Sequence, residues 1–319
     1  MSKQSATRLE PAPEPDPEKD AAPLGPPAFP PARLGRFLIE REVGRGMDSV
    51  VYRAVDPESK EIVALKVLYA ASKAQTPEAL LEAVRREAEI LKGLNHPHIV
   101  GVRDSGMADG RPYIAYPFIR GLPLDQGLSS GTLDRHAALK VLVAVAHAVH
   151  HAHEQGFIHR DLKPRNVVVS SDGQPYVLDF GLSWFRGDRA DEHVQSIVGT
   201  PAYMSPEQAR GEEEQLTPAS DVFALGAMLY EILTGRPPFT GETPWRTRQM
   251  IMAKPVTPPR AFDSAIDIHL ERIVLHSLEK APAKRYAAAE QFAEDLERAL
   301  EGRPPHGPRS TGFLRRLFR

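Results

Sequence analysis

Strand-forming and helix-forming patterns occupy different parts of this chain, and that segregation constrains its fold more than any other feature. The first part holds short runs with the period-2 alternation of strands, and expected strands lie at 37–39, 50–55 and 62–68. The later part holds the strongest helical patterns, at 137–154 and 218–233. The sequence therefore predicts an α+β protein: a small antiparallel sheet lobe, then a larger, mainly helical lobe.

One helix is expected inside the strand-rich part. Thr76 suits the N-cap and Pro77 suits the first helical position, and the pattern continues to about Gly93. Further strands are expected near Val100 and Tyr113. We therefore expect a first lobe at 37–117 that contains one helix, and a helical lobe at 118–301.

Composition changes at both ends of the chain. Residues 1–36 hold nine of the 30 prolines and are expected to form a disordered, Pro-rich tail, because such a segment cannot bury a core. Residues 302–319 carry five arginines and no acidic residue, which predicts a basic C-terminal tail. Within it, Gly312–Arg319 alternates large apolar residues with arginines. That pattern favours weak contact with an anionic membrane or an acidic partner, although a solvated basic end is the alternative.

Charge and composition exclude several classes of function. The 40 Lys+Arg balance 42 Asp+Glu, so no basic field indicates a nucleic-acid partner, and we expect none. The absence of Cys excludes disulfides, Cys-ligated metals and a thiol nucleophile. The most apolar helical stretch, 137–152, is interrupted by Lys140 and histidines and is too short to span a bilayer. We therefore expect a cytoplasmic protein without a transmembrane segment.

A lysine and a glutamate are predicted to meet in the first lobe. Alternation along 62–68 places Lys66 on an otherwise apolar strand face. A strand lysine often simply extends its ammonium group into water at an edge. However, Glu87 falls at the margin of the apolar stripe of the 77–93 helix, where its charge needs a partner, and Lys66 is the natural candidate.

Oxygen-bearing side chains flank a predicted hairpin at 167–178. Asn166 precedes its first strand and Asp179 follows its second, so antiparallel pairing brings both to one end. Isolated Asn and Asp residues near strand ends usually form turns. With Asp161 only five residues before Asn166, a site for Mg²⁺ is favoured, because amide and carboxylate oxygens suit that ion. Gly44 and Gly46 lie in a turn that could approach an anion, or could be an ordinary hairpin turn.

The run His159-Arg160-Asp161-Leu162-Lys163-Pro164-Arg165-Asn166, followed by Asp179-Phe180-Gly181, resembles the catalytic loop and metal-binding segment of protein kinases. The resemblance covers roughly 37–300 and implies the two-lobed protein-kinase fold. Lys163, and Thr200 ahead of Ser205-Pro206-Glu207, resemble the serine/threonine branch. The sequences of 51–54 and 206–211 are similar to those of its bacterial, Hanks-type members.

The resemblance implies roles for the residues already singled out. Asp161 would orient the substrate hydroxyl and accept its proton, and Lys163 would stabilise the migrating phosphoryl group. Lys66, fixed by Glu87, would hold the α- and β-phosphates of ATP. Asn166 and Asp179 would hold Mg²⁺, with Mn²⁺ as an alternative ion.

The resemblance also implies a nucleotide-binding set: Gly44, Gly46, Ser49, Val51, Ala64, Lys66, Tyr116, Pro117 and Ile119. Ser49 stands where the third glycine of the phosphate loop is usual. Tyr116 would guard the back pocket, and the Pro117 carbonyl and the Ile119 backbone would meet the adenine. Arg120 stands where an acidic residue is frequent, near the ribose.

The implied activity is transfer of the ATP γ-phosphate to Ser/Thr hydroxyls of proteins, with autophosphorylation, in signal transduction. A pseudokinase scaffold and a small-molecule phosphotransferase are the rival interpretations. Asp221, and Arg285 with Glu207, resemble the family's buried structural pairs. Ser196 is the expected regulatory phosphosite, its phosphate contacting Arg160, unless Asp191 or Glu192 provides a built-in anion.

Overall fold

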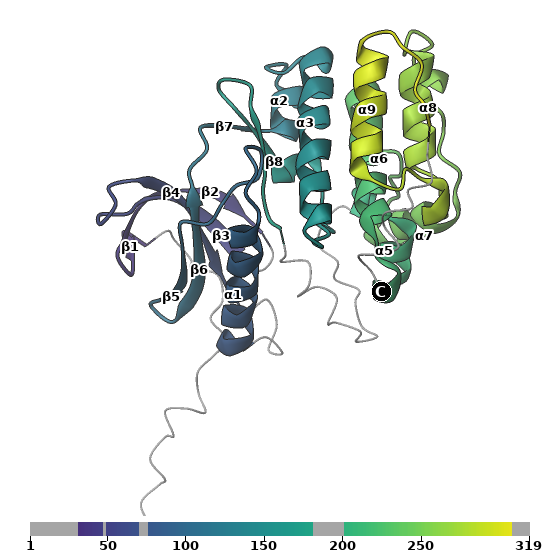
Figure 1. Cartoon of the computed structure of the whole chain (residues 1–319). Coiled ribbons are helices and arrows are strands. Elements are labelled where there is room, and N and C mark those ends of the chain that lie inside the picture. The colour runs from purple at the N-terminus through teal and green to yellow at the C-terminus, as the bar shows by residue number, and fades with distance from the viewer. Residues whose placement is uncertain (1–30, 47–48, 70–75, 181–200, 308–319) are drawn as a thin grey trace, which may run out of the picture.

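The chain forms two lobes joined near residue 117, as seen in the computed structural model (Figure 1), which describes residues 31–46, 49–69, 76–180 and 201–307. The first lobe is a six-stranded antiparallel sheet with strand order β1-β2-β3-β4-β6-β5. Its strands are β1 (Arg33–Leu34), β2 (Phe37–Arg45), β3 (Ser49–Val55), β4 (Ile62–Leu68), β5 (Asp104–Ala108) and β6 (Arg111–Pro117).

Helix α1 (Pro77–Gly93) packs against this sheet (Figure 1). The Thr76 side chain accepts a hydrogen bond from the Ala79 amide and so caps the helix, as expected. Val84 and Leu91 point inward and are buried, so the amphipathic stripe positions Glu87 between them.

A small second sheet lies between the large sheet and the helices, in the order β7-β8-β9 (Figure 1). Its strands are β7 (Gly121–Pro123), β8 (Val167–Ser170) and β9 (Pro175–Val177). Strands β8 and β9 are antiparallel, with Val167 opposite Val177, which confirms the predicted hairpin.

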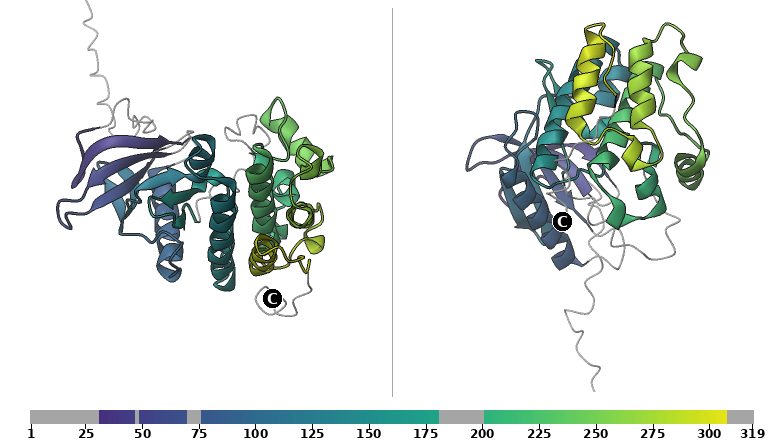
Figure 2. Two further views of the ribbon diagram at one scale, coloured as in Figure 1. Left: turned by 90° about the horizontal axis from the view of Figure 1, so that it is seen from above. Right: turned by 45° about the vertical axis from the view of Figure 1, so that its right-hand side comes forward.

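The second lobe is helical, and Figure 2 shows its helices gathered at the opposite end of the molecule from the large sheet. Its α-helices are α2 (Leu124–Ser129), α3 (Arg135–Glu154), α5 (Pro206–Arg210), α6 (Pro218–Thr234), α7 (Pro244–Ala253), α8 (Ile268–Ser277) and α9 (Ala289–Leu300). Short 3-10 turns, η1 to η5, occupy Pro164–Asn166, Pro201–Tyr203, Glu213–Gln215, Pro259–Ala261 and Pro282–Lys284. Helix α6 is buried along nearly its whole length and ends at Gly235, whose φ of 73° explains the glycine.

Two expectations about element boundaries were inaccurate. No strand forms at Val100; Ile99 makes a single parallel bridge to Val177, and the strand begins at Asp104. The sheet also begins before Phe37, because Arg33 and Leu34 pair with β2 and Leu34 is buried. Residues 31–36 are therefore part of the folded lobe, and residues 1–30 lie outside the described residues.

The second lobe continues past Leu300. The backbone amides of His306 and Gly307 donate to the two oxygens of the buried Asp295 carboxylate, at 2.7 and 2.8 Å. Tyr286 donates to the same side chain. The first residues of the expected basic tail are thus packed on α9, and 308–319 lie outside the described residues. In the parts of the chain described, no helix combines the length and apolar character needed to cross a membrane.

Candidate active site

One face of the large sheet carries the residues predicted to hold the nucleotide. In the strand register Val51 lies opposite Lys66, and Ala64 lies between Arg53 on β3 and Tyr116 on β6. Directly paired residues project to the same side, so Val51, Ala64, Lys66 and Tyr116 share one face. The Gly46 amide donates to the Ser49 carbonyl across the β2–β3 turn, at 2.7 Å. The sheet therefore supports the alternation predicted for 62–68.

Lys66 reaches from this face to the segment after β9. Its Nζ lies 2.5 Å from Oδ1 of Asp179, and the lysine is 5% exposed. Burial alone would raise the pKa of Asp179, but the charge and hydrogen bond of Lys66 outweigh burial and hold that pKa below its ordinary value. Asp179 is therefore a carboxylate, the form needed to bind a cation.

Glu87 is fully buried on α1, and its Oε1 accepts a hydrogen bond from the Tyr116 hydroxyl at 2.5 Å. Burial, followed by the charge of Glu87, raises the pKa of Tyr116 well above its ordinary value. The contacts described here for Lys66 and Glu87 run to Asp179 and Tyr116. A direct Lys66–Glu87 ion pair stays a prediction.

The predicted catalytic loop brings three side chains together. Lys163 Nζ lies 2.8 Å from Asp161 Oδ2. The Asn166 amide Nδ2 donates to the Asp161 carbonyl at 2.8 Å and to its carboxylate at 3.3 Å. Because Asn166 lies in the 3-10 turn η1, just before β8, the hairpin fixes its position relative to Asp161. Asp161 is thus held by a lysine and an amide.

Asp221, in the first turn of α6, fixes the backbone of this loop by hydrogen bonds. Its carboxylate accepts hydrogen bonds from the amides of His159 and Arg160, at 2.8 and 2.9 Å, and contacts His153 Nε2 at 2.7 Å. Burial alone would raise the pKa of Asp221, but the bonds with His153 and His159 hold that pKa below its ordinary value. Arg160 has a left-handed backbone, φ 65°, which these bonds stabilise.

The oxygen atoms of Asn166 and Asp179 could hold a divalent cation. Because Asn166 uses its amide nitrogen on Asp161, its amide oxygen is the donor atom that faces away from that contact. The Leu178 amide donates to the Asn166 carbonyl at 2.9 Å, so Asp179 follows directly at the same end of the hairpin. Within the described ranges, no three His, Asp or Glu side chains gather as a metal set, so phosphate oxygens and water would complete the coordination.

A second buried ion pair supports the helical lobe. Arg285 makes two hydrogen bonds to the Glu207 carboxylate, at 2.8 and 2.9 Å, and both side chains are 0% exposed. Its remaining donors reach the carbonyls of Glu279, Lys280 and Ala219. The predicted pairings of Asp221 and of Arg285 with Glu207 are confirmed, and their role is structural.

Residues 37–296 match the protein kinase domain family. This chain belongs to the protein kinase family. It is 36% identical over 281 residues to serine/threonine-protein kinase PknB of Mycobacterium tuberculosis, an alignment that covers 86% of this chain and 44% of that protein. It is 37% identical over 292 residues to a probable serine/threonine-protein kinase of Streptomyces coelicolor, covering 89% and 43%. The chain thus spans less than half the length of these relatives.

Solved kinase structures share the fold. A mutant of the Mycobacterium tuberculosis PknI kinase domain superposes with a TM-score of 0.65 at 27% identity, covering 83% of this chain and 96% of that one. Rad53 residues 1–466 in complex with AMP-PNP superpose with a TM-score of 0.65 at 26% identity, covering 83% and 65%. The predicted two-lobed protein-kinase fold and the Ser/Thr-kinase resemblance are confirmed.

The predicted hinge of this kinase domain follows Tyr116. The Phe118 amide donates to the Ile62 carbonyl, which ties the hinge to β4. A Cβ on Gly121 would lie 2.1 Å from the Val169 carbonyl oxygen, so only glycine allows β7 to approach β8 just after Arg120. The roles of Pro117 and Ile119 at the adenine stay predictions.

Arg160 of the kinase catalytic loop has a carboxylate neighbour that sequence reasoning missed. Its guanidinium lies 3.5 Å from Glu213 Oε2, on the 3-10 turn after α5. The signal was present as the acidic run Glu212–Glu214. The predicted phosphosite Ser196, and the alternatives Asp191 and Glu192, lie outside the described residues.

The histidines of α3 are partners of other elements. His153 contacts Asp221, whereas His147 lies 3.2 Å from Glu297 and His150 lies 3.4 Å from Glu290, both on α9. Their positions in the sequence do not reveal that each of these three contacts a carboxylate on another helix.

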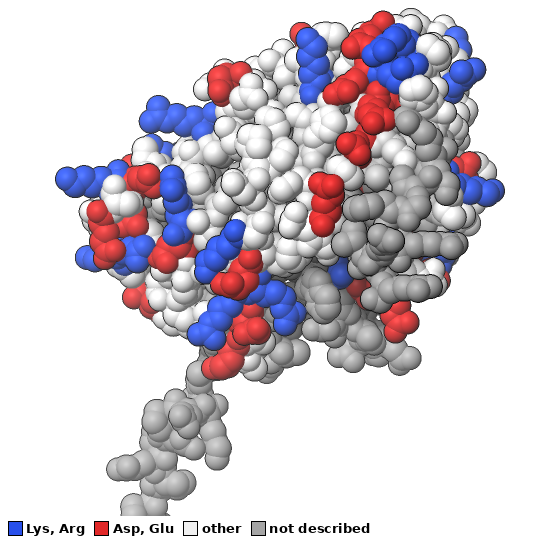
Figure 3. Space-filling view, viewed as in Figure 1, with Lys and Arg blue, Asp and Glu red and all other residues white. Residues whose placement is uncertain are grey.

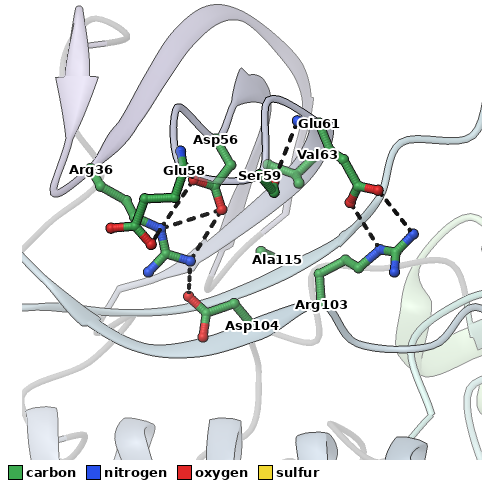
Figure 4. Close-up of a pocket in the computed structure, with 9 residues that line it drawn as sticks. All are labelled: Arg36, Asp56, Glu58, Ser59, Glu61, Val63, Arg103, Asp104 and Ala115. Atoms are coloured by element: carbon green, nitrogen blue, oxygen red, sulfur yellow. Dashed lines mark hydrogen bonds and ion pairs between the residues drawn. The ribbon is translucent and has the colours of Figure 1, made fainter.

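Figure 4 shows the side chains that line a polar hollow on the kinase sheet. Val63 and Ala115 line it, and both project to the face opposite Lys66. Arg36 lies there between the carboxylates of Asp56 and Asp104, at 3.2 and 2.6 Å. The hollow therefore consists of ion pairs that fasten the start of the sheet to β5, and it contains none of the predicted nucleotide-binding residues.

Proposed function

We propose that this chain is an active serine/threonine protein kinase that transfers the γ-phosphate of ATP to Ser/Thr hydroxyls of proteins in a signalling role. The observation that supports the proposal best is the pair of contacts at the lobe junction. Asp161 is held by Lys163 and Asn166, and Lys66 reaches Asp179 from the opposite lobe. A cytoplasmic location would suit this activity.

The proposed mechanism assigns one task to each group. Asp161 accepts the proton of the substrate hydroxyl as its oxygen attacks the γ-phosphorus and the bond to the β-phosphate oxygen breaks. Lys163, 2.8 Å from Asp161, balances charge on the migrating phosphoryl group. Lys66, kept in place by Glu87, holds the α- and β-phosphates. Mg²⁺, held by Asn166 and Asp179, would neutralise phosphate charge when bound, and Mn²⁺ could replace it.

The two rival functions differ from this one at identifiable points. A pseudokinase scaffold would be favoured by loss of a catalytic residue, yet Lys66, Glu87, Asp161, Asn166 and Asp179 are all present. A small-molecule phosphotransferase could share the catalytic loop. The capping box from Ser205 to Gln208, and the Gln208 side chain on the Arg160 carbonyl, link this loop to the segment through Glu207 that resembles protein kinases.

The test is transfer of labelled phosphate from ATP to a generic protein such as casein, with Mg²⁺ and with a chelator. Lys66→Met and Asp161→Asn should each reduce turnover by about 100-fold or more while leaving the fold intact. Lys92→Met, the same change at an exposed lysine of α1, is the matched control and should retain activity. Near-normal turnover in either catalytic variant, or without a divalent ion, would refute these assignments.

We also propose autophosphorylation at Ser196, with its phosphate contacting Arg160. On phosphorylation, the Arg160 guanidinium would leave Glu213, which lies 3.5 Å away, and bind the phosphate, which carries more negative charge. Mass spectrometry after incubation with ATP should find modified Ser196, and Ser196→Ala should lower activity. An unmodified Ser196 together with full activity of the variant would reject this control.

We further propose that the basic tail contacts an anionic membrane or an acidic partner. Asp295 anchors the chain as far as Gly307, so the tail starts from the α9 side of the second lobe. Figure 3 shows acidic and basic side chains intermixed on the face it displays, so neither charge dominates there. A larger fraction of the full chain than of a chain ending at Gly307 should sediment with anionic vesicles. Equal binding of the two chains would refute the proposal.

A further inference from the structure

Tyr116 connects the hinge strand to helix α1 through one hydrogen bond. Tyr116 is the next-to-last residue of β6, directly before Pro117, and is 8% exposed. Its hydroxyl lies 2.5 Å from Oε1 of Glu87, which is 0% exposed. The bond therefore joins α1 to β6 through two residues that are 29 positions apart in sequence.

The direction of this bond is determined by its surroundings. Burial and the charge of Glu87 raise the pKa of Tyr116 well above its ordinary value, so the phenol stays protonated and must donate. Hydrogen bonds to a buried carboxylate are among the stronger ones in proteins. The bond therefore restricts rotation of the Glu87 side chain through its Oε1 atom.

The same bond lies next to the phosphate-binding lysine. Tyr116 pairs with Ala64 across the strands, and Ala64 is two residues from Lys66 on the same face. The charge of Asp179, the partner of Lys66, also raises the pKa of Tyr116, after burial and the charge of Glu87. A change at the Tyr116 hydroxyl would thus reach Lys66 through the predicted Lys66–Glu87 pair.

We infer that Tyr116 is a positioning residue for phosphoryl transfer: its hydroxyl fixes Glu87, and with it α1, in the arrangement that lets Lys66 hold the ATP phosphates. The inference rests on the proposed kinase activity. Because the hydroxyl donates to Glu87, we expect it not to bind the adenine itself. Its loss should therefore lower the rate of transfer more than the affinity for ATP.

Tyr116→Phe tests this role by removing one oxygen atom. The expected result is a kcat about tenfold lower, with the KM for ATP changed by less than about twofold. Tyr113→Phe is the matched control. Tyr113 lies on the same strand, is 6% exposed, and donates from its hydroxyl to a carboxylate, Asp104, at 2.7 Å. It should lose similar stability and keep its kcat.

A double-mutant cycle with Glu87→Ala separates action through Glu87 from a general effect. In the Glu87→Ala background, Tyr116→Phe should cause no further loss of kcat. An undiminished kcat in Tyr116→Phe, an equal loss in Tyr113→Phe, or losses that multiply in the double variant would each overturn the inference.

Amide hydrogen exchange gives a readout independent of activity. Tyr116→Phe should speed exchange in α1 around 84–91, and Tyr113→Phe should leave α1 unchanged. Unchanged α1 exchange in Tyr116→Phe contradicts the inference even if the wild-type chain transfers no phosphate. Absence of transfer by the wild-type chain would instead refute the proposed function.

Discussion

Arg160 and Asp179 both have a left-handed backbone, with φ of 65° and 61°. That conformation is unfavourable for non-glycine residues by about 1 kcal/mol or more. At Arg160 the opposing interaction is visible, because the Asp221 carboxylate binds its amide. At Asp179 the ammonium group of Lys66 binds the side chain. Both strained residues flank the proposed transfer site. The buried Asp221 carboxylate of the second lobe stabilises the strained backbone at Arg160.

His96 should make the stability of this kinase domain dependent on pH. Burial, followed by the neighbouring His151, His98 and His147, lowers the pKa of His96 to about 4. Its Nδ1 also accepts a hydrogen bond from the His98 amide, which requires the neutral ring. The pKa of His96 in the folded state lies below its unfolded value of 6.5. The contribution of neutral His96 to stability is therefore fully present above pH 6.5 and is lost as pH falls towards 4.

Asparagine at this position can accept the same bond and does not titrate. His96→Asn should therefore flatten the fall of the melting temperature between pH 6.5 and 4, by about 3 °C for each kcal/mol involved. His136→Asn, at an exposed position of α3, is the control. Identical pH profiles for wild type and His96→Asn would show that His96 does not cause the acid sensitivity.

At the scale of elements, α6 and α8 approach each other closely at Gly226. A Cβ built there would lie 2.3 Å from Cβ of Ser277. Gly226→Ala should therefore force the helices apart and destabilise the protein by about 1–3 kcal/mol in denaturant unfolding. Gly93→Ala is the same change in a helix with no atom within 4 Å, and it should be neutral or slightly stabilising. Equal stability of the two variants would contradict the close-packing explanation.

Local signals predicted elements well where a cap or a turn marked an end. Thr76 with Pro77, Gly235, and the turn between β8 and β9 each set a boundary that the structure confirms. Prediction was poorer where pairing decides the element. Leu34 has no strand signal of its own and becomes buried because β2 offers it an edge. Val100 has a strand-like sequence, but the hydrogen bond from its amide to the Val177 carbonyl of β9 does not extend into a strand.

Side-chain partners were predictable only when a family motif named them. Asp221, and Glu207 with Arg285, were expected as buried pairs and are so. The contact of Tyr116 with Glu87 and that of Arg160 with Glu213 join residues 29 and 53 positions apart, and no periodicity in the sequence relates them. They depend on how α1 docks on the sheet and how η3 approaches the catalytic loop.

At the scale of the whole molecule, one continuous hydrophobic core crosses the lobe boundary. It includes Val84 and Leu91 of α1 together with Leu142 and Val149 of α3. A second cluster, including Phe37 and Tyr52, fills only the other face of the sheet. Because the larger core is shared, we expect thermal unfolding in a single transition measured by calorimetry. Two separated transitions would contradict this cooperativity.

Arg285 tests the same cooperativity from the second lobe. Arg285→Ala leaves the Glu207 charge buried without its partner and should cost about 3–5 kcal/mol of unfolding free energy. The whole transition should move to lower temperature. Arg303→Ala, which removes an exposed ion pair with Glu301, should change stability by less than about 1 kcal/mol. A separate early transition in Arg285→Ala would show that the lobes unfold independently.

The hydrogen bonds from the His306 and Gly307 amides to Asp295 determine where another domain can be fused to this kinase domain. A chain cut after Leu300 would lose both amide donors and leave a buried carboxylate with fewer hydrogen bonds, which costs several kcal/mol. The C-terminal boundary of the folded domain is therefore at Gly307 and not at the last turn of α9. A reporter or a partner domain fused beyond it leaves the kinase core intact, whereas one fused at Leu300 starts by weakening the scaffold that it is meant to report on.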